Sequence, residues 1–295
     1  MTKKTDQADL TIVVLSFNTQ FWLKKTLTTL KEFYLDKTKY KVAVIVVDNA
    51  STDGSPTMVK KEFRWVKLIQ STGNVGFAAG NNIALQKLTS RYGMLLNSDT
   101  EFHHGSNLDV LIEYLDEHPT VGLITPRVEL PNGRVDMASH RGEPTPWTSL
   151  TYFLGLEKLF PHSHLFGQYH QTYRNMQEIH EIDACTGAAM MFPVKLMQKK
   201  VGYLDEQFFM YAEDLDWCRR FREAGKKVIY HPGAQITHHK YKSGIKSSST
   251  RFSKKVHNMF YDTMLMYYDK WYAAQYPKLY RTLLRAFLFV KKGGL

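Results

Sequence analysis

The sequence has few cysteines and no long apolar run. Cys185 and Cys218 are the only cysteines among 295 residues, too few for a disulfide framework and without metal-type spacing, so we expect both to be small buried residues. No stretch approaches the ~20 consecutive apolar residues of a membrane span. Residues 1–9 are polar and lack the apolar core of a secretory signal. These absences predict a reducing, cytoplasmic location and argue against an integral membrane protein.

The net charge of +11 is unevenly placed. Of the 39 lysines and arginines, 12 fall at 240–295, where the only acids are Asp262 and Asp269. Because leucines and aromatics accompany these bases, the segment suits a helix lying on an anionic membrane surface, here the inner face of the plasma membrane. Nucleic-acid binding fits the mixture less well, and we expect no nucleic-acid partner. The alternative is that the aromatics pack on the rest of the chain or on a second subunit of a homodimer.

The first half of the chain alternates strand and helix signals. With 43% hydrophobic residues it can bury a substantial core. Alternation of this kind predicts an α/β fold, with a mostly parallel nucleotide-binding sheet flanked by helices. The predicted strands are 10–17, 42–47, 66–70 and one ending at 97, and the predicted helices are 20–34, 55–63, 76–88 and 107–117.

The second half is less regular. Residues 131–179 are rich in Pro, Gly, His and aromatics, which predicts loops shaped around a substrate. Order returns with an apolar stretch ending at 192, and a C-terminal helical extension closes the chain. We expect a catalytic domain at 1–239, with a nucleotide-binding half at about 10–125 and an acceptor half at about 126–239, followed by the extension at 240–295. The predicted elements are helices at 194–200, 213–224, 252–272 and 278–290 and short strands at 227–230 and 235–237.

Two strand-like runs each end in an acid. Asp48 follows 42–47, and Asp99 comes just after 94–98. Ligands of open parallel sheets bind beyond the carboxyl ends of the strands, so these acids should face a nucleotide and a metal. Asn97 and Asp99, two residues apart on an extended segment, project to the same side and could hold a hard divalent cation. The plain alternatives are a capped βα turn after Asp48 and a polar strand end at Asp99.

The segment NVGFAAGNN at 74–82 is a second candidate for donor contacts. Its small residues, Gly76 among them, let a ligand approach the backbone, and a helix N-terminus favours anions, so Asn74 and Gly76 are candidate donor contacts. It lacks the glycine spacing of dinucleotide folds and the lysine of a P-loop. Tight packing of a helix on the sheet is the competing explanation.

Two further candidate functional segments lie in the second half of the chain. Glu213 and Asp214 open a helix directly after the aromatic run at 208–211, and the positive end of the helix keeps a carboxylate ionised and able to act as a general base. His238 follows the strand-like 235–237 and could complete a metal shell or contact a phosphate. Simple helix capping and a solvated surface histidine are the alternatives.

Taken in order, these segments resemble the family 2 glycosyltransferases of the GT-A fold, most closely their rhamnosyltransferase-like branch. The resemblance covers residues 10 to about 270. The matching segments are VVLSFN at 13–18, VDNASTDGS at 47–55, NVGFAAGNN at 74–82, LLNSDT at 95–100, CTGAAM at 185–190, VGYLDEQFFMYAEDLDWCRR at 201–220 and YHPGAQITHH at 230–239.

The resemblance implies inverting transfer of a sugar from a nucleoside diphosphate donor, with Mg²⁺ or Mn²⁺ as cofactor. It implies dTDP-rhamnose as the donor and a saccharide or polyprenyl-diphosphate-linked acceptor in bacterial surface polysaccharide synthesis. Asp48 would contact the base, Asp53 would line the same pocket, and Asp99 would bind the metal with His238 as a further metal or diphosphate contact. Asn97 stands where the wider fold has the first acid of its D-x-D, which leaves Asp99 as the only anionic ligand of the pair.

The same resemblance implies the catalytic groups. Asp214 would remove the proton from the acceptor hydroxyl, and Glu213 would help to orient donor or acceptor. Gly187 and Ala188 would lie beside the sugar. The reaction needs no covalent enzyme intermediate.

Other functions stay open from the sequence. The donor could be another sugar nucleotide, such as a UDP-hexose or UDP-galactofuranose. A sugar nucleotidyltransferase would share the nucleotide site but commonly shows a basic, glycine-rich loop near the N-terminus, and residues 15–18 (LSFN) have neither glycine nor base. A non-catalytic binding protein is least expected, because the acidic and metal-type positions are all intact.

Overall fold

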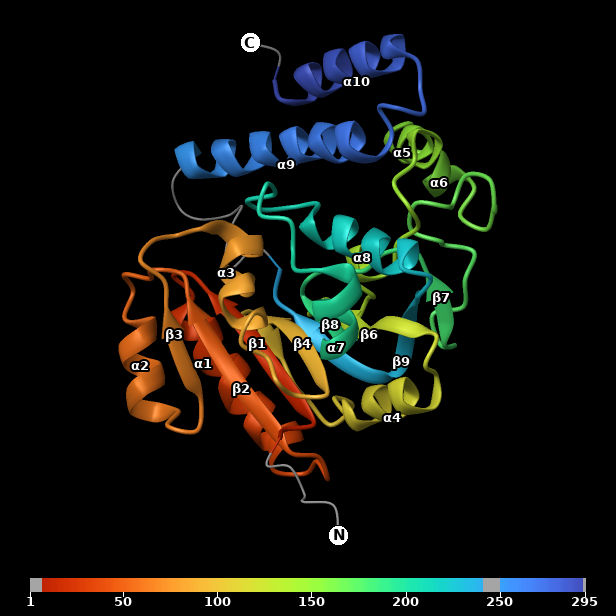
Figure 1. Ribbon diagram of the computed structural model, residues 1–295. Coiled ribbons are helices and arrows are strands. Elements are labelled where there is room, and N and C mark those ends of the chain that lie inside the picture. The colour runs from red at the N-terminus through yellow and green to blue at the C-terminus, as the bar shows by residue number, and fades with distance from the viewer. Residues whose placement is uncertain (1–6, 241–249, 294–295) are drawn as a thin grey trace.

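The computed structural model describes residues 7–240 and 250–293, and a curled nine-stranded sheet forms the centre of this part (Figure 1). The strand order is β3-β2-β1-β4-β8-β6-β9-β5, and β7 also pairs with β9. Strands β3, β2, β1 and β4 run parallel, as do β6 and β9, while β5, β7 and β8 are antiparallel to their partners. The predicted α/β class with a mostly parallel sheet is confirmed. The strands are β1 Leu10–Ser16, β2 Val42–Asp48, β3 Lys67–Gln70, β4 Tyr92–Asn97, β5 Thr100–Glu101, β6 Val121–Glu129, β7 His180–Ile182, β8 Ala189–Pro193 and β9 Lys227–His238.

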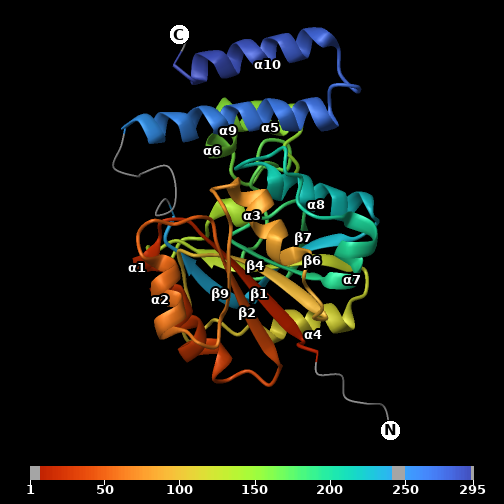
Figure 2. The same ribbon diagram turned by 60° about the vertical axis from the view of Figure 1, so that its left-hand side comes forward.

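Helices cover both faces of the sheet because side chains alternate along each strand. Leu10, Ile12 and Val14 of β1 belong to one buried cluster, whereas Val13 belongs to the other. Helices α1, α2 and α4 contribute to the first cluster, and α3, α7 and α8 to the second. Figure 2 shows the two layers from the side. These helices are α1 Gln20–Leu30, α2 Ser55–Glu62, α3 Gly76–Leu85, α4 Asp109–Glu117, α7 Val194–Leu196 and α8 Glu213–Glu223.

The chain ends in two long helices, α9 Thr250–Trp271 and α10 Lys278–Lys291. They lie over the side of the molecule that carries α8 (Figures 1 and 2). Pro277 precedes the first residue of α10 and has an extended backbone, so the break between the predicted helices lies where the sequence placed it. None of the described helices is long and apolar enough to cross a membrane.

Three parts of the secondary structure differ from the prediction. Strand β6 was not predicted at all, and β9 is one continuous strand where two short ones were expected. Both strands contain proline, and their register shifts so that Pro126 pairs with His231 and Arg127 with Gln235. Residues 232–234 form a bulge that accommodates the Pro-Gly pair without ending the strand. The region 131–179 also holds α5 Pro146–Phe153, α6 Leu156–Leu159 and a 3₁₀ turn at Met137–Ser139, where loops were predicted.

The partly buried carboxylate of Glu143 joins α8 to α9. Its Oε1 accepts hydrogen bonds from Arg219 Nη1 at 2.9 Å, from the Tyr267 hydroxyl at 2.7 Å and from the Tyr272 hydroxyl at 2.6 Å. Its Oε2 pairs with Arg222. The two arginines come from α8, Tyr267 comes from α9 and Tyr272 directly follows that helix, so one carboxylate holds both helices against the loop after β6.

Removing this carboxylate should destabilise the fold. Truncating one partner of a buried ion pair leaves the other partner's charge uncompensated, so we expect Glu143→Ala to lower the free energy of unfolding by about 3 kcal/mol. Glu143→Gln should cost less because its amide oxygen still accepts hydrogen bonds. Urea unfolding measures both. Glu113→Ala removes an exposed pair with Lys39 and should change stability by less than about 0.5 kcal/mol. Equal effects at the two positions would contradict the central place of Glu143.

Candidate active site

The parallel register of three strands brings their polar ends to one edge. Ser16 of β1 pairs with Asp48 of β2, and Leu15 pairs with Asn97 of β4. Asp48 and Asn97 therefore flank the end of β1, and Asp99 follows within two residues. The predicted meeting of strand-end polar groups has the geometry of a ligand site beyond the carboxyl ends of parallel strands.

Asp48 is buried, and only one of its two carboxylate oxygens has a hydrogen-bond partner. Its Oδ2 accepts a hydrogen bond from the Ser51 backbone N–H at 3.0 Å, whereas its Oδ1 is buried and has no hydrogen-bond partner. A buried acceptor without a donor is unfavourable by about 1–3 kcal/mol. The adjacent Ala50 also has a left-handed backbone, with φ of 64°. Unpaired and strained groups gather at functional sites, and this oxygen is free to accept from a ring N–H of a base.

Asp53 has a different environment. Its Oδ2 accepts from the Gln20 backbone N–H at 2.7 Å, at the start of α1, and its Oδ1 accepts from the N–H and hydroxyl of Ser55 at the start of α2. Burial alone would raise the pKa of Asp53, but these hydrogen bonds lower it. The carboxylate thus caps two helices, which accounts for its position without a ligand.

Asn74 and Gly76 lie where α3 meets the loop that leads into α8. Asn74 Oδ1 accepts hydrogen bonds from Asn49 Nδ2 and from the Gly76 N–H, each at 3.0 Å. Gly76 has φ of +86°, and a Cβ there would lie 2.4 Å from the Phe209 carbonyl oxygen. The N–H of Phe77 donates to the same oxygen at 2.7 Å. Close backbone packing therefore explains this glycine, and a donor contact remains a prediction.

Gly187 and Ala188 lead into β8, directly beside β4. A Cβ on Gly187 would lie 2.7 Å from the Phe77 ring, so only glycine fits there without a shift. The Asn97 N–H donates to the Ala188 carbonyl at 3.0 Å. The two residues predicted to lie beside the sugar are thus next to Asn97, in the predicted metal site.

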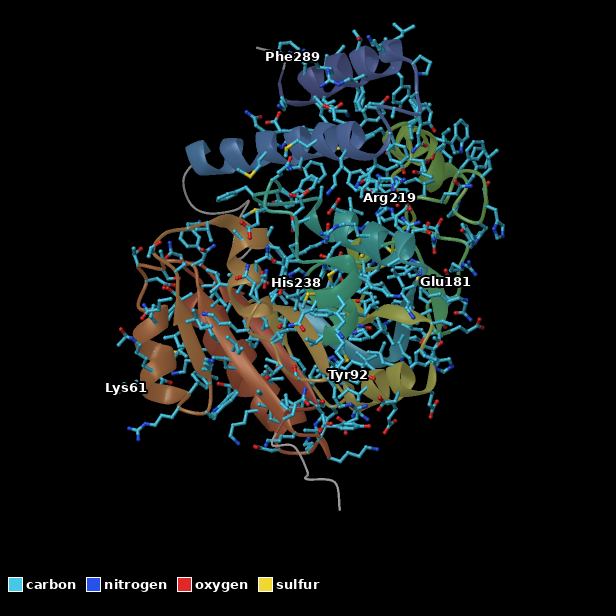
Figure 3. The ribbon with its side chains drawn as sticks, in the orientation of Figure 1. Lys61, Tyr92, Glu181, Arg219, His238 and Phe289 are labelled. Carbon is cyan, nitrogen blue, oxygen red and sulfur yellow. The ribbon has the colours of Figure 1, made fainter. Side chains whose placement is uncertain are left out.

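The pairing of β5 with β9 places His238 beside Asp99. Its Nε2 lies 3.2 Å from Asp99 Oδ1 and 3.3 Å from Asn97 Nδ2, and its Nδ1 lies 3.3 Å from Asp136 Oδ2. Lys240 Nζ pairs with Asp136 at 2.6 Å. Figure 3 shows His238 near the middle of the molecule. The structure therefore joins three predicted residues to two that the sequence did not identify, Asp136 and Lys240.

The charges in this group favour a protonated ring. Burial alone would lower the pKa of His238, but hydrogen bonds to Asp136 and Asp99 outweigh it and raise the pKa to about 9. Burial would raise the pKa of Asp136, yet His238 and Lys240 hold it below its usual value. A histidine ligates a metal only as the neutral ring, so a cation would have to displace this proton.

Asp99, with Asn97 and His238 beside it, could supply one carboxylate ligand to a hard cation. Asp99 Oδ1 is buried and accepts no hydrogen bond of good geometry, although His238 is close. Within the described ranges, no three His, Cys, Asp or Glu side chains converge as a self-sufficient metal shell. Mg²⁺ commonly takes one or two carboxylates and completes its shell with phosphate and water oxygens, and Asp99 with Asn97 and His238 beside it suits that arrangement.

The acid pair at the start of α8 follows a strained turn. Tyr211 and Ala212 both have positive φ, 74° and 66°, which bulky L residues rarely adopt. Asp214 Oδ2 accepts from Arg141 Nη2 at 2.8 Å, and the same nitrogen donates to the Cys185 carbonyl at 3.1 Å. Arg141 thus ties the predicted base to the segment that leads into β8. Sequence reasoning did not identify it, because residues 131–179 and their surroundings lack periodicity.

Glu213 lies in a very different environment from its neighbour. It is buried, and its Oε2 has no hydrogen-bond partner. Burial, reinforced by the Asp214 charge, raises the pKa of Glu213 well above its usual value. The two adjacent acids therefore differ: Glu213 favours the neutral form, and Asp214 is paired with a cation.

Residues 11–193, more than half of the chain, match the family model described as "Glycosyl transferase family 2". The chain belongs to glycosyl transferase family 2. The resemblance seen in the sequence is thereby confirmed, and this protein is a glycosyltransferase.

The glycosyltransferase has curated relatives at modest identity. It is 26% identical over 214 residues to the N-acetylglucosaminyl-diphospho-decaprenol L-rhamnosyltransferase of Mycobacterium tuberculosis, with 69% of this chain and 68% of the relative covered. It is 28% identical over 184 residues to the low-salt glycan biosynthesis hexosyltransferase Agl10 of Haloferax volcanii, with 60% of this chain and 52% of the relative covered.

Solved structures share its fold. S. aureus TarS 1-349 in complex with UDP-GlcNAc superposes with a TM-score of 0.59 at 17% identity, covering 96% of this chain and 72% of that one. The mannosyltransferase PcManGT from Pyrobaculum calidifontis, in complex with GDP-Man and Mn²⁺, gives a TM-score of 0.56 at 18% identity, covering 97% and 70%. At these identities the likeness shows the fold alone, and it confirms the predicted GT-A fold.

The raised pKa of Glu213 predicts a pH dependence of stability. The native state holds this proton more tightly than the unfolded chain, so the resulting stabilisation is full below about 4.5 and is lost as pH rises toward the native pKa. The free energy of unfolding of the native protein, minus that of Glu213→Gln, should fall by at most about 1.4 kcal/mol per pH unit. Urea unfolding at several pH values measures it. Glu117→Gln, on the exposed end of α4, is the control, and the same pH dependence in both variants would disprove the assignment.

Proposed function

We propose that this glycosyltransferase moves a sugar from a nucleoside diphosphate donor to a hydroxyl of a saccharide or lipid-linked saccharide, with inversion and with Mg²⁺ or Mn²⁺. The observation that carries the proposal is the pair of buried carboxylate oxygens Asp48 Oδ1 and Asp99 Oδ1, which accept no hydrogen bond of good geometry and follow the two strands that flank β1. Asp48 Oδ1 suits a hydrogen bond from the nucleotide base, and Asp99 Oδ1 suits a cation bound to the diphosphate. We assign the nucleotide half to about 10–125, the acceptor half to about 126–239 and a separate surface function to 240–295.

In the proposed donor site, Asp48 accepts from the base, with Asp53 holding the loop between the two helices that it caps. Asp99 would hold the metal, with Asn97 and His238 beside it, and the cation would offset the negative charge that builds on the leaving diphosphate. Asp136 fixes the ring orientation of His238 through Nδ1, as carboxylates commonly do for ligating histidines. Gly187 and Ala188 leave room for the sugar at the start of β8.

In the proposed reaction, Asp214 takes the proton of the acceptor hydroxyl as that oxygen attacks the anomeric carbon from the face opposite the diphosphate. Each carboxylate oxygen has two lone pairs, so the Arg141 hydrogen bond orients Asp214 and still leaves acceptor capacity for the substrate. Glu213 is buried and its pKa is raised, so it would help to orient donor or acceptor while holding its proton more readily than an exposed acid.

The donor proposed first is dTDP-rhamnose. It is supported by the likeness to an L-rhamnosyltransferase, whose name also includes a diphospho-decaprenol acceptor. The hexosyltransferase and mannosyltransferase among the similar proteins keep a UDP-hexose, UDP-galactofuranose or another sugar nucleotide as the alternative. A nucleotidyltransferase has no such support.

A donor screen tests the function. Purified protein is incubated with dTDP-rhamnose and with UDP- and GDP-sugars, with Mg²⁺, with Mn²⁺ or with chelator, and release of nucleoside diphosphate is followed. Asp214→Asn should keep donor binding and lower kcat by ~10² to 10⁴. Asp99→Ala should weaken only the metal-dependent part of donor binding. Release of pyrophosphate would indicate a nucleotidyltransferase, and near-normal turnover by Asp214→Asn would reject the base.

We further propose that the enzyme works in the cytoplasm, held peripherally on the inner face of the plasma membrane by α10. Basic side chains lie among large exposed apolar ones on this helix, and each basic residue near an anionic leaflet contributes roughly 1 kcal/mol. Phe289 lies at the outer end of the molecule, far from the sheet (Figure 3). The exposed apolar residues of α10 are Leu279, Leu283, Phe287, Phe289 and Val290, and its bases are Lys278, Arg281, Arg285 and Lys291.

Sedimentation with vesicles containing phosphatidylglycerol tests the membrane proposal. The native protein should pellet at low salt, and Leu279→Glu with Leu283→Glu should stay in the supernatant because two apolar contacts are replaced by charges that the lipid repels. Phe21→Glu, at an equally exposed apolar residue on α1, is the matched control and should pellet. If the native protein does not pellet, or the α10 variant pellets equally well, α10 is a packing or dimer element.

A further inference from the structure

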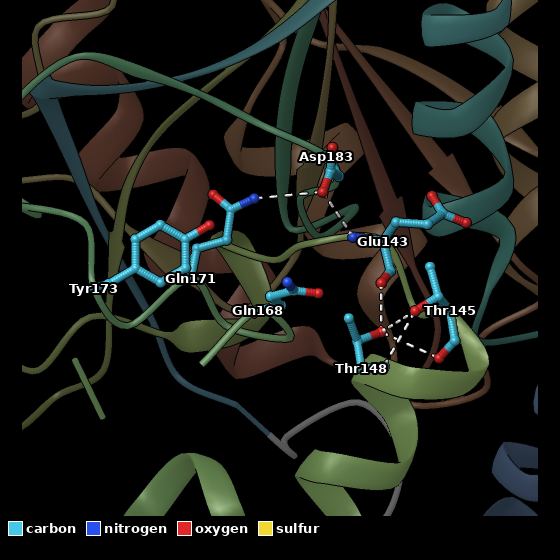
Figure 4. A pocket seen from close by; sticks show the side chains of 7 residues that line it. All are labelled: Glu143, Thr145, Thr148, Gln168, Gln171, Tyr173 and Asp183. Carbon is cyan, nitrogen blue, oxygen red and sulfur yellow. Dashed lines mark hydrogen bonds between the residues drawn. The ribbon is translucent and has the colours of Figure 1, made fainter. Parts of the chain in front are cut away.

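A polar hollow lies between the start of α5 and the segment that precedes β7 (Figure 4). Its volume is about 170 Å³. None of the candidate donor, metal or acid residues lines it. The lining residues are Glu143, Thr145, Thr148, Gln168, Gln171, Tyr173 and Asp183.

The lining offers hydrogen-bonding groups of neutral or negative character. Gln171 is buried and its Oε1 has no hydrogen-bond partner, while its Nε2 donates to Asp183 Oδ2 at 3.4 Å. Its backbone is left-handed, with φ of 49°. The carboxamide of Gln168 lines the space with no hydrogen bond to the other lining side chains drawn (Figure 4). A buried acceptor without a donor at a strained residue marks a site that a donating ligand would satisfy.

The charges indicate what kind of ligand fits. No lysine or arginine is among the lining residues, and Asp183 faces the space. The Glu143 carboxylate points toward α8, where both of its oxygens are already engaged. A phosphate would meet the Asp183 carboxylate here, with Arg222 Nη1 at 3.6 Å as the nearby cation, already shared with Glu143. A ligand rich in hydroxyls would instead donate to the Gln171 and Asp183 oxygens and accept from the Gln168 amide, with the Tyr173 ring as a wall.

Helix α8 gives the distance from this hollow to the acid pair. Asp214, in the first turn, pairs with Arg141, and Arg219 and Arg222 further along the helix pair with Glu143, two residues after Arg141. A helix rises 1.5 Å per residue, so five to eight residues separate the two contacts by roughly 7 to 12 Å. This distance is longer than the sugar ring that carries the reacting hydroxyl. The next sugar ring of the same acceptor saccharide could reach it.

We propose that this hollow binds a neutral sugar residue of the acceptor, one that is not itself glycosylated. The proposal rests on the glycosyl transfer proposed above. It follows that the preferred acceptor carries at least two sugar rings, and that a lipid diphosphate, if present, binds elsewhere.

Acceptor length and Gln168→Ala together test this. With the best donor of the screen, KM is measured for aryl glycosides of one, two and three neutral sugars and for undecaprenyl diphosphate bearing one N-acetylglucosamine. The native enzyme should show a lower KM for the longer glycosides. Gln168→Ala should raise that KM about tenfold and leave the monosaccharide KM, the donor KM and kcat unchanged. If Gln168→Ala changes the KM of all acceptors equally, the residue has only a structural role and the proposal is overturned. The proposal is also overturned if the KM changes for none of the acceptors.

Two controls separate the possible failures. Gln86→Ala, an exposed glutamine just after α3, should behave as native with every acceptor. Tyr173→Ala removes the wall of the hollow and should repeat the length-dependent effect if Gln168→Ala does not fold. Saturation-transfer NMR with the trisaccharide reports binding without turnover. If the native enzyme turns over no donor, the proposed function fails, while loss of the NMR signal in Gln168→Ala still supports the hollow and an unchanged signal overturns it.

Discussion

The parallel pairing of β1 with both β2 and β4 is the constraint on which the rest of the site depends. It levels the three strand ends, and the helices on both faces bury them, so Asp48 and Asp99 each carry a buried oxygen that accepts no hydrogen bond of good geometry from the described residues. Such groups are unfavourable for folding by about 1–3 kcal/mol each. A fold that keeps two of them on the strands that flank β1 has an unfavourable feature that packing alone does not explain and that a bound ligand would offset.

A second constraint is the attachment of α8. Arg141 and Glu143, on one short segment after β6, contact the first and the later turns of this helix, and Glu143 also accepts from Tyr267 of α9 and from Tyr272 just after it. The carboxyl end of the chain therefore supports the helix that presents Asp214. Supporting groups of this kind decide how closely a catalytic side chain holds its geometry. A change of position at α9 would reach the acid pair through Glu143 and through the buried Asp216 of α8, which accepts from Trp271.

Much of this was predictable because the informative patterns are local. Continuous apolar runs located β1, β2 and β4, and Leu23, Leu27 and Leu30 at helical spacing located α1. The family resemblance rests on segments of six to twenty residues, so it too survives without knowledge of long-range contacts. The prediction from local sequence failed where strands contain proline. Pro126 lies inside β6 and the Pro-Gly pair inside β9, where a bulge that depends on the partner strand accommodates them.

The remainder depends on contacts that only the folded chain makes. Asp136 and Arg141 lie in an aperiodic region, and nothing in their neighbours marks them as partners of His238 and Asp214, about 100 and 73 residues away. The difference between Glu213 and Asp214 is likewise invisible in sequence. Two consecutive acids at a helix start look equivalent, but a 100° turn of the helix per residue directs one into the core and the other toward Arg141. Burial then raises the pKa of Glu213, whereas Asp214 lies against the Arg141 guanidinium, so two like groups meet different surroundings at one shared site.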